Sequence, residues 1–351
     1  MVIIYLPEIH RRVGLASTTA TGALLSAGGL SAWSWAWQPW HLFAAAALSG
    51  VGWAVTSGAA LNAVIAPWFE RGRPKALSLA FNGASVGGIL FVPLWVALIG
   101  RFGFRIAASL IGLSMIVVIG TLAIRFLRYG PCYYGLNPDG DPVAPPSRKP
   151  APTRSRSELL RDKRFITLSV AFALGLFAQI GLFAHLIIRL SPVIGTEAAG
   201  AAVSFATICA VIGRTVLGSW IGDRDRRVAA ALNFVVQAAG VLLLGFNTGV
   251  IALWAGCLLF GLGVGNLTTL PPLIAQKEFN HGDVGVVVAL VIAINQGVFA
   301  FAPATFGALR EATGSYQDPF LLAAIVQICA AIIVVIGRGP SSAFKTTNWP
   351  N

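Results

Sequence analysis

A run of 57 consecutive residues, positions 13–69, contains no Asp, Glu, Lys or Arg. One helix needs about 20 apolar residues to cross a bilayer, so the run is long enough for two. Pro39 lies near its middle and interrupts a helix, since proline has no backbone N–H to donate. Four tryptophans at positions 33, 35, 37 and 40 are typical of a membrane–water interface. The run predicts two membrane-spanning helices.

The composition of the whole chain agrees with this prediction. Hydrophobic residues make up 56% of it, charged residues only 11%, and the mean hydropathy is +0.77, whereas soluble domains carry about 25% charged residues. Uncharged runs separated by charged loops therefore predict an all-α integral membrane protein. Its ten expected spans are residues 13–36, 41–67, 75–100, 105–127, 165–188, 197–221, 228–246, 250–275, 284–309 and 319–337.

The positive charges fall unevenly between these spans. Of the 25 Lys and Arg residues, 20 lie in the terminal segments and the loops on one side, and one, Arg214, lies inside a span. The other side carries four, at positions 101, 105, 189 and 310. Because cytoplasmic loops are rich in Lys and Arg, we expect a multi-pass protein of the cell membrane with both termini in the cytoplasm. The net charge of +12 then reflects topology and not a nucleic-acid partner.

Other function classes leave no signature in the sequence. The four cysteines and four histidines are dispersed, which favours neither a disulfide framework nor a metal site. No glycine-rich nucleotide loop and no nucleophile beside a base is present. We therefore expect no catalysis, no metal and no cofactor. An integral-membrane enzyme is the weaker alternative.

An internal repeat relates the two halves of the chain. Residues 8–13 (Glu-Ile-His-Arg-Arg-Val) match residues 223–228 (Asp-Arg-Asp-Arg-Arg-Val), and three further matches follow at nearly the same offset, among them residues 80–82 with 293–295. Internal repeats are common in transporters. In the second half two spans precede the matching loop, but in the first half only seven residues do. The repeat therefore predicts a twelve-helix architecture of which ten helices are present.

These motifs resemble the major facilitator superfamily, and within it the monocarboxylate and oxalate/formate porters. The resemblance rests on residues 213–227 (Gly-Arg-Thr-Val-Leu-Gly-Ser-Trp-Ile-Gly-Asp-Arg-Asp-Arg-Arg), residues 66–73 (Ala-Pro-Trp-Phe-Glu-Arg-Gly-Arg) and residues 135–140 (Gly-Leu-Asn-Pro-Asp-Gly). The chain departs from the family pattern at position 225, where Asp stands in place of the usual Gly.

The resemblance implies two helical bundles that rock about a central site. The expected parts are an N-terminal bundle (1–127), a Pro-rich cytoplasmic linker (128–164), a C-terminal six-helix bundle (165–340) and a cytoplasmic tail (341–351). The implied function is secondary transport of small organic anions such as monocarboxylates, by a protein expected to be a monomer, with an oligomer as the alternative. A non-transporting fragment is the alternative function, since a helix that should line the cavity is missing.

Arg214 is the first candidate for substrate binding. It lies nine residues before Asp223, which places it about 13 Å along the helix and near mid-membrane. An intramembrane cation is costly and usually functional. In the resembling carriers an Arg four residues before a Gly binds the substrate carboxylate, and Arg214 keeps that spacing with Gly218. A purely structural Arg, paired with buried groups, is the alternative.

Further candidates follow from helix position. In this superfamily the first, fourth, seventh and tenth of twelve helices line the cavity, which implies a set of five residues: Trp53, Ser57, Gln179, Asn266 and Thr269. Gln296 is added as an amide at membrane depth, and His185 as a group that could take a proton. Packing is the alternative for His185 and for the intramembrane amides, and the matched positions of Asn82 and Asn295 favour a structural use.

A cytoplasmic gate is predicted at the repeated charged loop. Such a loop can pair across the ends of two bundles in one state and release in the other. Ordinary positive-inside topology explains the arginines but not the acid at position 223. The gate residues are expected to be Asp223, Arg224, Arg226 and Arg227, with Glu8, Arg11 and Arg12 in the first half.

Overall fold

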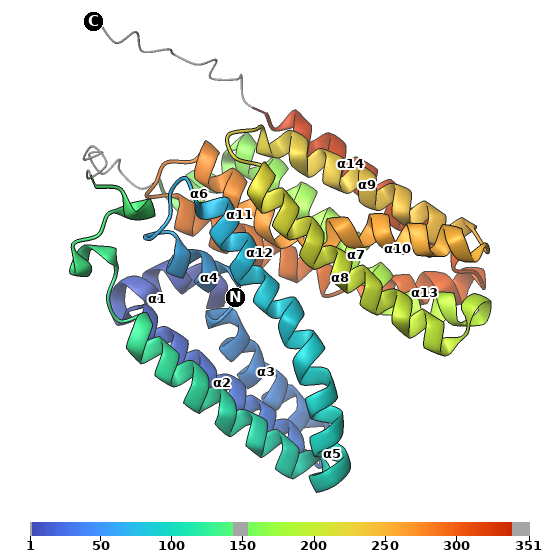
Figure 1. Cartoon of the computed structure of the whole chain (residues 1–351), viewed down its shortest axis with the longest axis horizontal. Coiled ribbons are helices and arrows are strands. Elements are labelled where there is room, and N and C mark those ends of the chain that lie inside the picture. The colour runs from blue at the N-terminus through green and yellow to red at the C-terminus, as the bar shows by residue number, and fades with distance from the viewer. Residues whose placement is uncertain (1, 143–153, 339–351) are drawn as a thin grey trace, which may run out of the picture.

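The computed structural model of the protein describes residues 2–142 and 154–338, apart from the side chains of residues 88, 89, 92 and 93. All regular structure in this part of the chain is helical (Figure 1). The first half contains η1 (Val2–Tyr5), α1 (Leu6–Val13), α2 (Leu15–Ser34), α3 (Pro39–Val55), α4 (Gly58–Ile65) and α5 (Arg73–Phe126). The second half contains α7 (Lys163–Ile194), α8 (Thr196–Trp220), α9 (Arg226–Phe246), α10 (Val250–Val264), α11 (Asn266–Glu278), α12 (Val284–Phe299), α13 (Ala302–Thr313) and α14 (Gln317–Ile336).

Each of the ten predicted spans coincides with helical structure. Among the described residues, eight helical segments are long and apolar enough to cross a membrane. They are Pro39–Ile65, Leu94–Phe126, Lys163–Ile194, Thr196–Trp220, Arg226–Phe246, Val250–Glu278, Val284–Thr313 and Gln317–Ile336. Helix α2 is not among the eight, since its many Gly, Ser and Thr residues lower its hydropathy, and of the predicted span 75–100 only the residues from Leu94 onward fall in one of the eight.

The long helix α5 contains the sharp reversal that the sequence places between residues 100 and 105. Gly103 has φ 76° and ψ 164°, a non-helical conformation with positive φ that interrupts the helix. A residue with a Cβ is strained there. Figure 1 shows the chain running down to this turn and back again as a helical hairpin. Gly195 turns the chain between α7 and α8 in the same way, with φ 83°.

Small residues bring neighbouring helices close together. A Cβ placed on Gly52 of α3 would lie 2.5 Å from the backbone nitrogen of Ser26 on α2. Gly213 of α8 faces α10 even more tightly, because a Cβ there would lie 2.0 Å from the carbonyl oxygen of Leu262. Close backbone approach at small residues is the usual way in which membrane helices associate. At these two positions the close packing of the helices therefore requires glycine.

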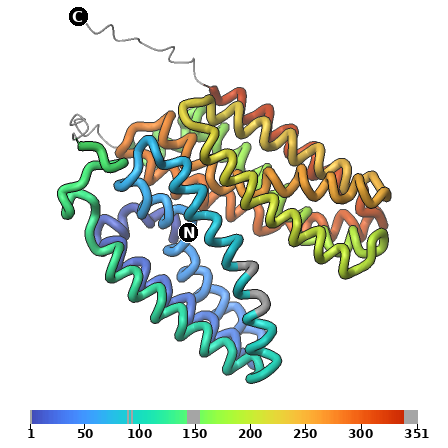
Figure 2. Tube along the Cα trace, in the orientation of Figure 1, coloured from blue at the N-terminus to red at the C-terminus, as the bar shows by residue number. Residues whose placement is uncertain are grey.

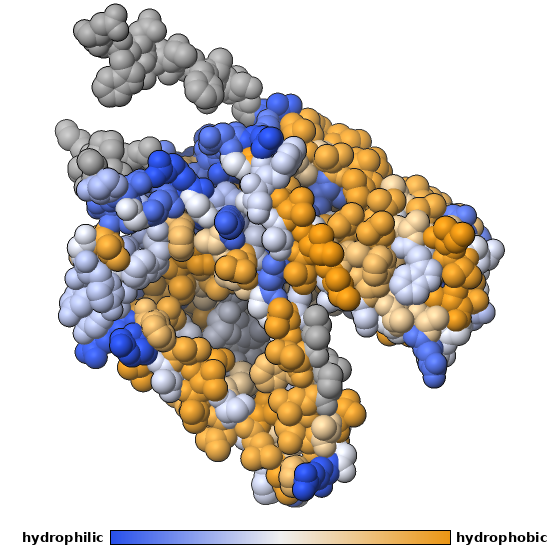
Figure 3. Space-filling model, in the orientation of Figure 1, coloured by the Kyte–Doolittle hydropathy of each residue, from blue (hydrophilic) through white to orange (hydrophobic). Residues whose placement is uncertain are grey.

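Among the described residues, the two halves of the chain pack together toward one end of the molecule. One buried hydrophobic cluster joins both halves there, with Leu6 and Leu77 from the first half and Phe165, Leu273 and Val287 from the second. A second cluster contains residues of α7–α10, α13 and α14 alone. The bundles diverge away from the shared cluster (Figure 2). Figure 3 shows hydrophilic residues gathered over this joined end, near α6 and α11, and apolar flanks on both bundles. We call this joined end of the molecule, where the hydrophilic residues gather, the charged end.

The linker contacts both bundles. It contains η2 (Pro131–Tyr134), η3 (Pro138–Gly140) and α6 (Arg156–Arg161), while its prolines at 145, 146, 150 and 152 lie outside the described residues. The carboxylate of Asp139 accepts hydrogen bonds from the backbone amides of Glu70, Arg71 and Gly72, at 3.1, 2.8 and 3.0 Å. It thereby caps the loop that leads into α5, because it satisfies backbone N–H groups that precede the helix. The motif 135–140 therefore has a structural role.

We expect Asp139→Ala to expose this loop. A hydrogen bond contributes about 0.5–1.5 kcal/mol net, so the amides of residues 70–72 should exchange hydrogen roughly five- to tenfold faster in mass spectrometry. Asp141→Ala is the matched control, because Asp141 pairs only with the exposed side chain of Arg71. Equal exchange in the two variants would contradict the capping role.

The same contact predicts a pH dependence. Burial acts to raise the pKa of Asp139, but the three amides outweigh it and hold the pKa below its ordinary value of 3.8. The stabilisation is therefore complete above that value and is lost as the pH falls through the lowered pKa of the folded state. Exchange at residues 70–72 should stay constant from neutral pH down to about pH 5, once corrected for intrinsic exchange.

Candidate substrate site and gate

A cavity of about 450 Å³ lies between the two bundles, next to the shared core. Trp53 at the end of α3, Ser57 before α4 and Phe81 on α5 come from the first half. Gln179 on α7, Thr268 and Pro271 on α11, and Asn295, Gln296 and Phe299 on α12 come from the second. Ligand sites are usually concave and mostly apolar with a few polar groups, as this cavity is.

The cavity brings together four of the predicted site residues. Trp53, Ser57, Gln179 and Gln296 all line it, although they lie on four separate segments of the chain. Three of the five residues that helix position implies thus line one cavity, together with Gln296. Sequence reasoning did not propose Thr268, and it assigned Asn295 a packing role.

Three polar atoms in this cavity are buried and have no hydrogen-bond partner among the residues that the structure describes. They are Oγ of Ser57, Oε1 of Gln179 and Oδ1 of Asn295. Their residues are 5%, 5% and 3% exposed. A buried polar group without a partner costs about 1–3 kcal/mol, so such groups call for a water molecule or a ligand. The signal that could have identified Asn295 is its place beside Gln296.

Arg214 lies behind the cavity wall and not on its surface. It is 6% exposed, and its Nε donates to the carbonyl oxygen of Gly265 at 3.0 Å. Thr268, which lines the cavity, donates its hydroxyl to the same carbonyl at 2.9 Å. The Nη1 of Arg214 donates to Oδ1 of Asn82 on α5 at 2.9 Å. Both of these partners are neutral groups.

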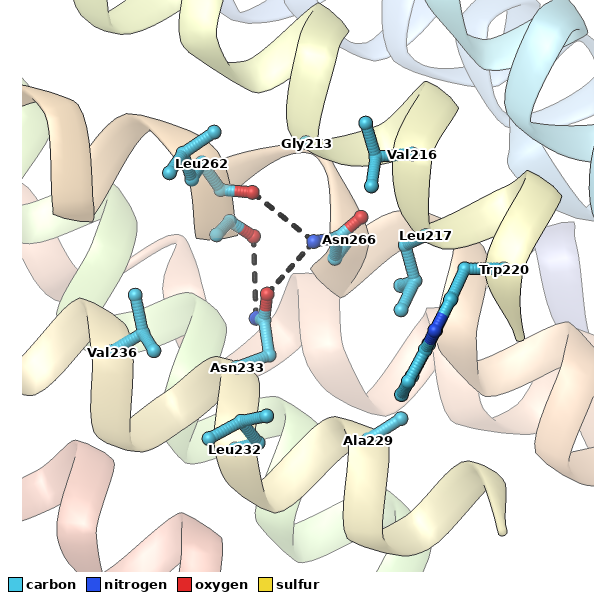
Figure 4. A pocket seen from close by; sticks show the side chains of 11 residues that line it. Gly213, Val216, Leu217, Trp220, Ala229, Leu232, Asn233, Val236, Leu262 and Asn266 are labelled. Carbon is cyan, nitrogen blue, oxygen red and sulfur yellow. Dashed lines mark hydrogen bonds between the residues drawn. The ribbon is translucent and has the colours of Figure 1, made fainter. Parts of the chain in front are cut away.

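Three other predicted residues point away from the cavity. Asn266 donates to Asn233 at 2.8 Å and faces an apolar groove between α8, α9 and α10 (Figure 4). Thr269 is 1% exposed and donates to the carbonyl oxygen of Asn266 at 3.3 Å. His185 lies 3.1 Å from the carbonyl oxygen of Pro303 through its Nε2. All three contacts are within the second half.

The predicted gate residues of the first half pair with one another. Glu8 bonds Arg11 and Arg12 at 2.6 Å each, along the exposed side of α1. Such exposed pairs contribute little to stability.

The gate residues of the second half also bond mainly within their own bundle. Arg224 stacks over Trp220, and Arg226 donates to Leu273 and Gln276. Lys277 donates to the carbonyl oxygen of Asp223 at 2.5 Å. Asp225, the departure from the family pattern, caps α9 through the amides of Arg227 and Val228. Arg227, which is buried, makes an ion pair with the partly exposed Glu278 at 2.6 Å.

Other groups bridge the halves at the charged end. Gln276 donates its amide to the carbonyl oxygen of Glu70 at 2.8 Å. Arg156 of the linker donates to the carbonyl oxygen of Ile4 at 3.2 Å and lies over the ring of Tyr5. With the shared core, these contacts close the charged end between the bundles.

The described side chains do not form a metal-binding site. Within residues 2–142 and 154–338, no group of three or more His, Cys, Asp or Glu side chains is placed to hold a metal ion.

The sequence matches the family model of the Major Facilitator Superfamily over residues 9–303. The chain belongs to this superfamily and is a multi-pass membrane protein that acts as a secondary transporter, not an enzyme. The predicted all-α fold is thereby confirmed.

Individual relatives are distant. The chain is 26% identical to monocarboxylate transporter 11 of Mus musculus over 341 residues, which cover 93% of this chain and 72% of that protein. It is 24% identical to monocarboxylate transporter 12 of Xenopus laevis, with coverage of 90% and 73%. The crystal structure of the E. coli fucose:proton symporter FucP superposes with a TM-score of 0.74 at 15% identity, covering 97% of this chain and 88% of that one.

Proposed function

We propose that this transporter carries small organic anions, foremost monocarboxylates, by alternating access of the cavity between the bundles. The observation that carries the proposal is Arg214, a buried cation beside the cavity whose two hydrogen-bond partners are neutral. A guanidinium binds a carboxylate through two parallel hydrogen bonds, which are stronger than bonds to neutral acceptors. The names of the two carboxylate-transporting relatives support the same substrate class.

The cavity residues would then orient the rest of the substrate. Ser57, Gln179 and Gln296 offer polar groups, while Trp53 and Phe81 offer apolar surface. This division suits a small molecule with a carboxylate at one end and an apolar or weakly polar body. Asn266, Thr269 and His185 would act through packing, unless the bundle rearranges during transport.

The closed charged end indicates which conformational state of the transport cycle the structure represents. If the charged loops lie in the cytoplasm, as the distribution of Lys and Arg predicts, the cavity is shut toward the cytoplasm and the bundles separate toward the outside. We propose that this is the outward-facing state of a cell-membrane monomer with both termini inside. In this state the loop at 223–227 and the segment at 8–12 bond mainly within their own halves, so pairing across the halves stays a prediction.

The test is uptake into proteoliposomes of the purified chain, with radiolabelled pyruvate as the probe. We expect Arg214→Gln to lower pyruvate uptake about 10- to 100-fold, because a charge-assisted hydrogen bond contributes about 1.5–3 kcal/mol. Arg214→Lys should recover only part of the loss, since an ammonium lacks the planar fork.

Arg189→Gln is the matched control. Arg189 is also an arginine of a spanning helix, but it donates to the carbonyl oxygens of Gly245 and Asn247 and lies away from the cavity. Pyruvate uptake by the Arg189→Gln variant should stay within about twofold of uptake by the parent. Saturable pyruvate uptake that survives Arg214→Gln would overturn the assignment. Absence of pyruvate uptake in the parent chain would overturn the proposed function.

A further inference from the structure

The contact between Arg214 and Asn82 joins the two bundles inside the membrane. Arg214 belongs to α8 of the second half, and Asn82 belongs to α5 of the first. The amide of Asn82 is held at both ends, because its oxygen accepts from Arg214 at 2.9 Å and its nitrogen donates to the hydroxyl of Thr215 at 2.8 Å. Asn82 is 8% exposed, so water contributes little to this contact.

This contact requires α5 and α8 to be packed against each other. One turn toward the charged end from Arg214, a Cβ on Gly218 would lie 2.0 Å from the hydroxyl of Ser78 and 3.0 Å from the carbonyl oxygen of Pro74. The helices are therefore in backbone-to-side-chain contact along the closed end. Opening that end has to separate Asn82 from Arg214.

We propose that Asn82 is a latch that occupies Arg214 while the charged end is closed and frees it when that end opens. The proposal rests on the proposed function and assigns it a positioning residue. Once Asn82 has moved away, Arg214 keeps its hydrogen bond to the carbonyl oxygen of Gly265 and loses its second acceptor. A buried donor without an acceptor is costly, and a carboxylate satisfies it better than an amide does. The substrate anion takes the place of Asn82.

A directional consequence follows. A ligand shifts a conformational equilibrium only through its different affinity for the two states. Because Asn82 competes with the anion in the closed state alone, anion binding favours the state that is open at the charged end. Removing Asn82 should favour that state without any anion, and a negative charge at position 82 should oppose it.

The experiment measures opening directly. Ser78→Cys, in a background with the four native cysteines replaced by serine or alanine, provides a thiol that is buried only while α5 contacts α8. We would follow its labelling by a hydrophilic maleimide in the purified protein, with and without pyruvate. In the parent, pyruvate should speed labelling several-fold. Asn82→Ala should speed it without pyruvate and leave little further response.

Asn82→Asp should act in the opposite direction. An aspartate facing Arg214 makes an ion pair, so labelling should slow about tenfold or more. Adding Arg214→Gln to Asn82→Asp should abolish this slowing, which a general packing defect would not do. If Asn82→Asp does not yield folded protein by size-exclusion chromatography, the acceleration in Asn82→Ala carries the test.

The outcomes separate the two proposals. Labelling at the parent rate in both Asn82 variants would overturn the latch. Altered labelling in those variants, together with no response to pyruvate in the parent, would support the latch and overturn the monocarboxylate assignment.

Discussion

Replacing Arg227 with Met is expected to lower the free energy of unfolding by about 3 kcal/mol, because it removes the hydrogen bonds of a buried guanidinium and leaves a partly exposed carboxylate without its partner. Arg227 is 1% exposed, and its Nε and Nη2 bond both oxygens of Glu278 at 2.6 and 2.8 Å. Its Nη1 also reaches Thr167 on α7 and the carbonyl oxygen of Val334 on α14. One guanidinium thus ties the start of α9 to three other helices.

Unfolding of the purified protein in a denaturing detergent would measure this loss. Arg224→Met is the control, since Arg224 is exposed and contacts Trp220 through its ring and its carbonyl oxygen, and it should change stability by less than about 1 kcal/mol. The double variant Arg227→Met, Glu278→Leu should recover much of the stability, because it removes the orphaned charge as well. Similar losses in Arg224→Met and Arg227→Met would contradict this account.

Gly213→Ala is expected to destabilise the protein by about 3 kcal/mol or more. The added Cβ would lie 2.0 Å from the carbonyl oxygen of Leu262. Because that atom belongs to the backbone of α10, no side-chain rotation relieves the clash, and the two helices have to move apart. Overpacking usually costs about 1–3 kcal/mol where side chains can adjust, so a backbone clash belongs at or beyond the upper end.

Gly200→Ala on the same helix is the matched control. Nothing lies within 4 Å of a Cβ at Gly200, and alanine is the better helix former by about 0.8–1.0 kcal/mol. The two substitutions are chemically identical, yet we expect opposite signs. The same unfolding assay measures both. A loss of stability in Gly200→Ala equal to that in Gly213→Ala would show that backbone flexibility, and not the contact with α10, sets the effect.

The sequence predicted the fold well because membrane spans leave a strong local signal. Uncharged runs locate the helices, and glycines such as Gly103 and Gly195 stand where spans reverse direction. Both features depend on neighbouring residues alone. The count of spans is less secure where small residues dilute the hydropathy, as in α2.

The candidate site was predicted only in part, because helix position does not determine helix face. Helix α11 turns Leu267, Thr268 and Pro271 toward the cavity, whereas its neighbours Asn266 and Thr269 face into their own bundle. Successive residues differ by about 100° around a helix. Assigning the correct helix to the cavity therefore selects both residues that line the cavity and residues that do not.

The partners of the charged loop were beyond sequence reasoning for a related reason. Arg224 and Arg227 are three residues apart in one basic cluster, yet the first lies at the surface and the second inside a four-helix contact. Local sequence gives both the same charge. Only the packing of α7, α11 and α14 around the start of α9 distinguishes them.

The shared core at the charged end bears on how the protein is made. Leu6 and Leu77 leave the ribosome long before Phe165, Leu273 and Val287, against which their cluster is completed. Domains form in order of synthesis, so the first bundle has to wait in the membrane with an unfinished inner face. The second bundle, which has a cluster of its own, can fold as soon as it is inserted. Assembly of this transporter is therefore completed by its later half, and the waiting first half is the stage most exposed to quality control.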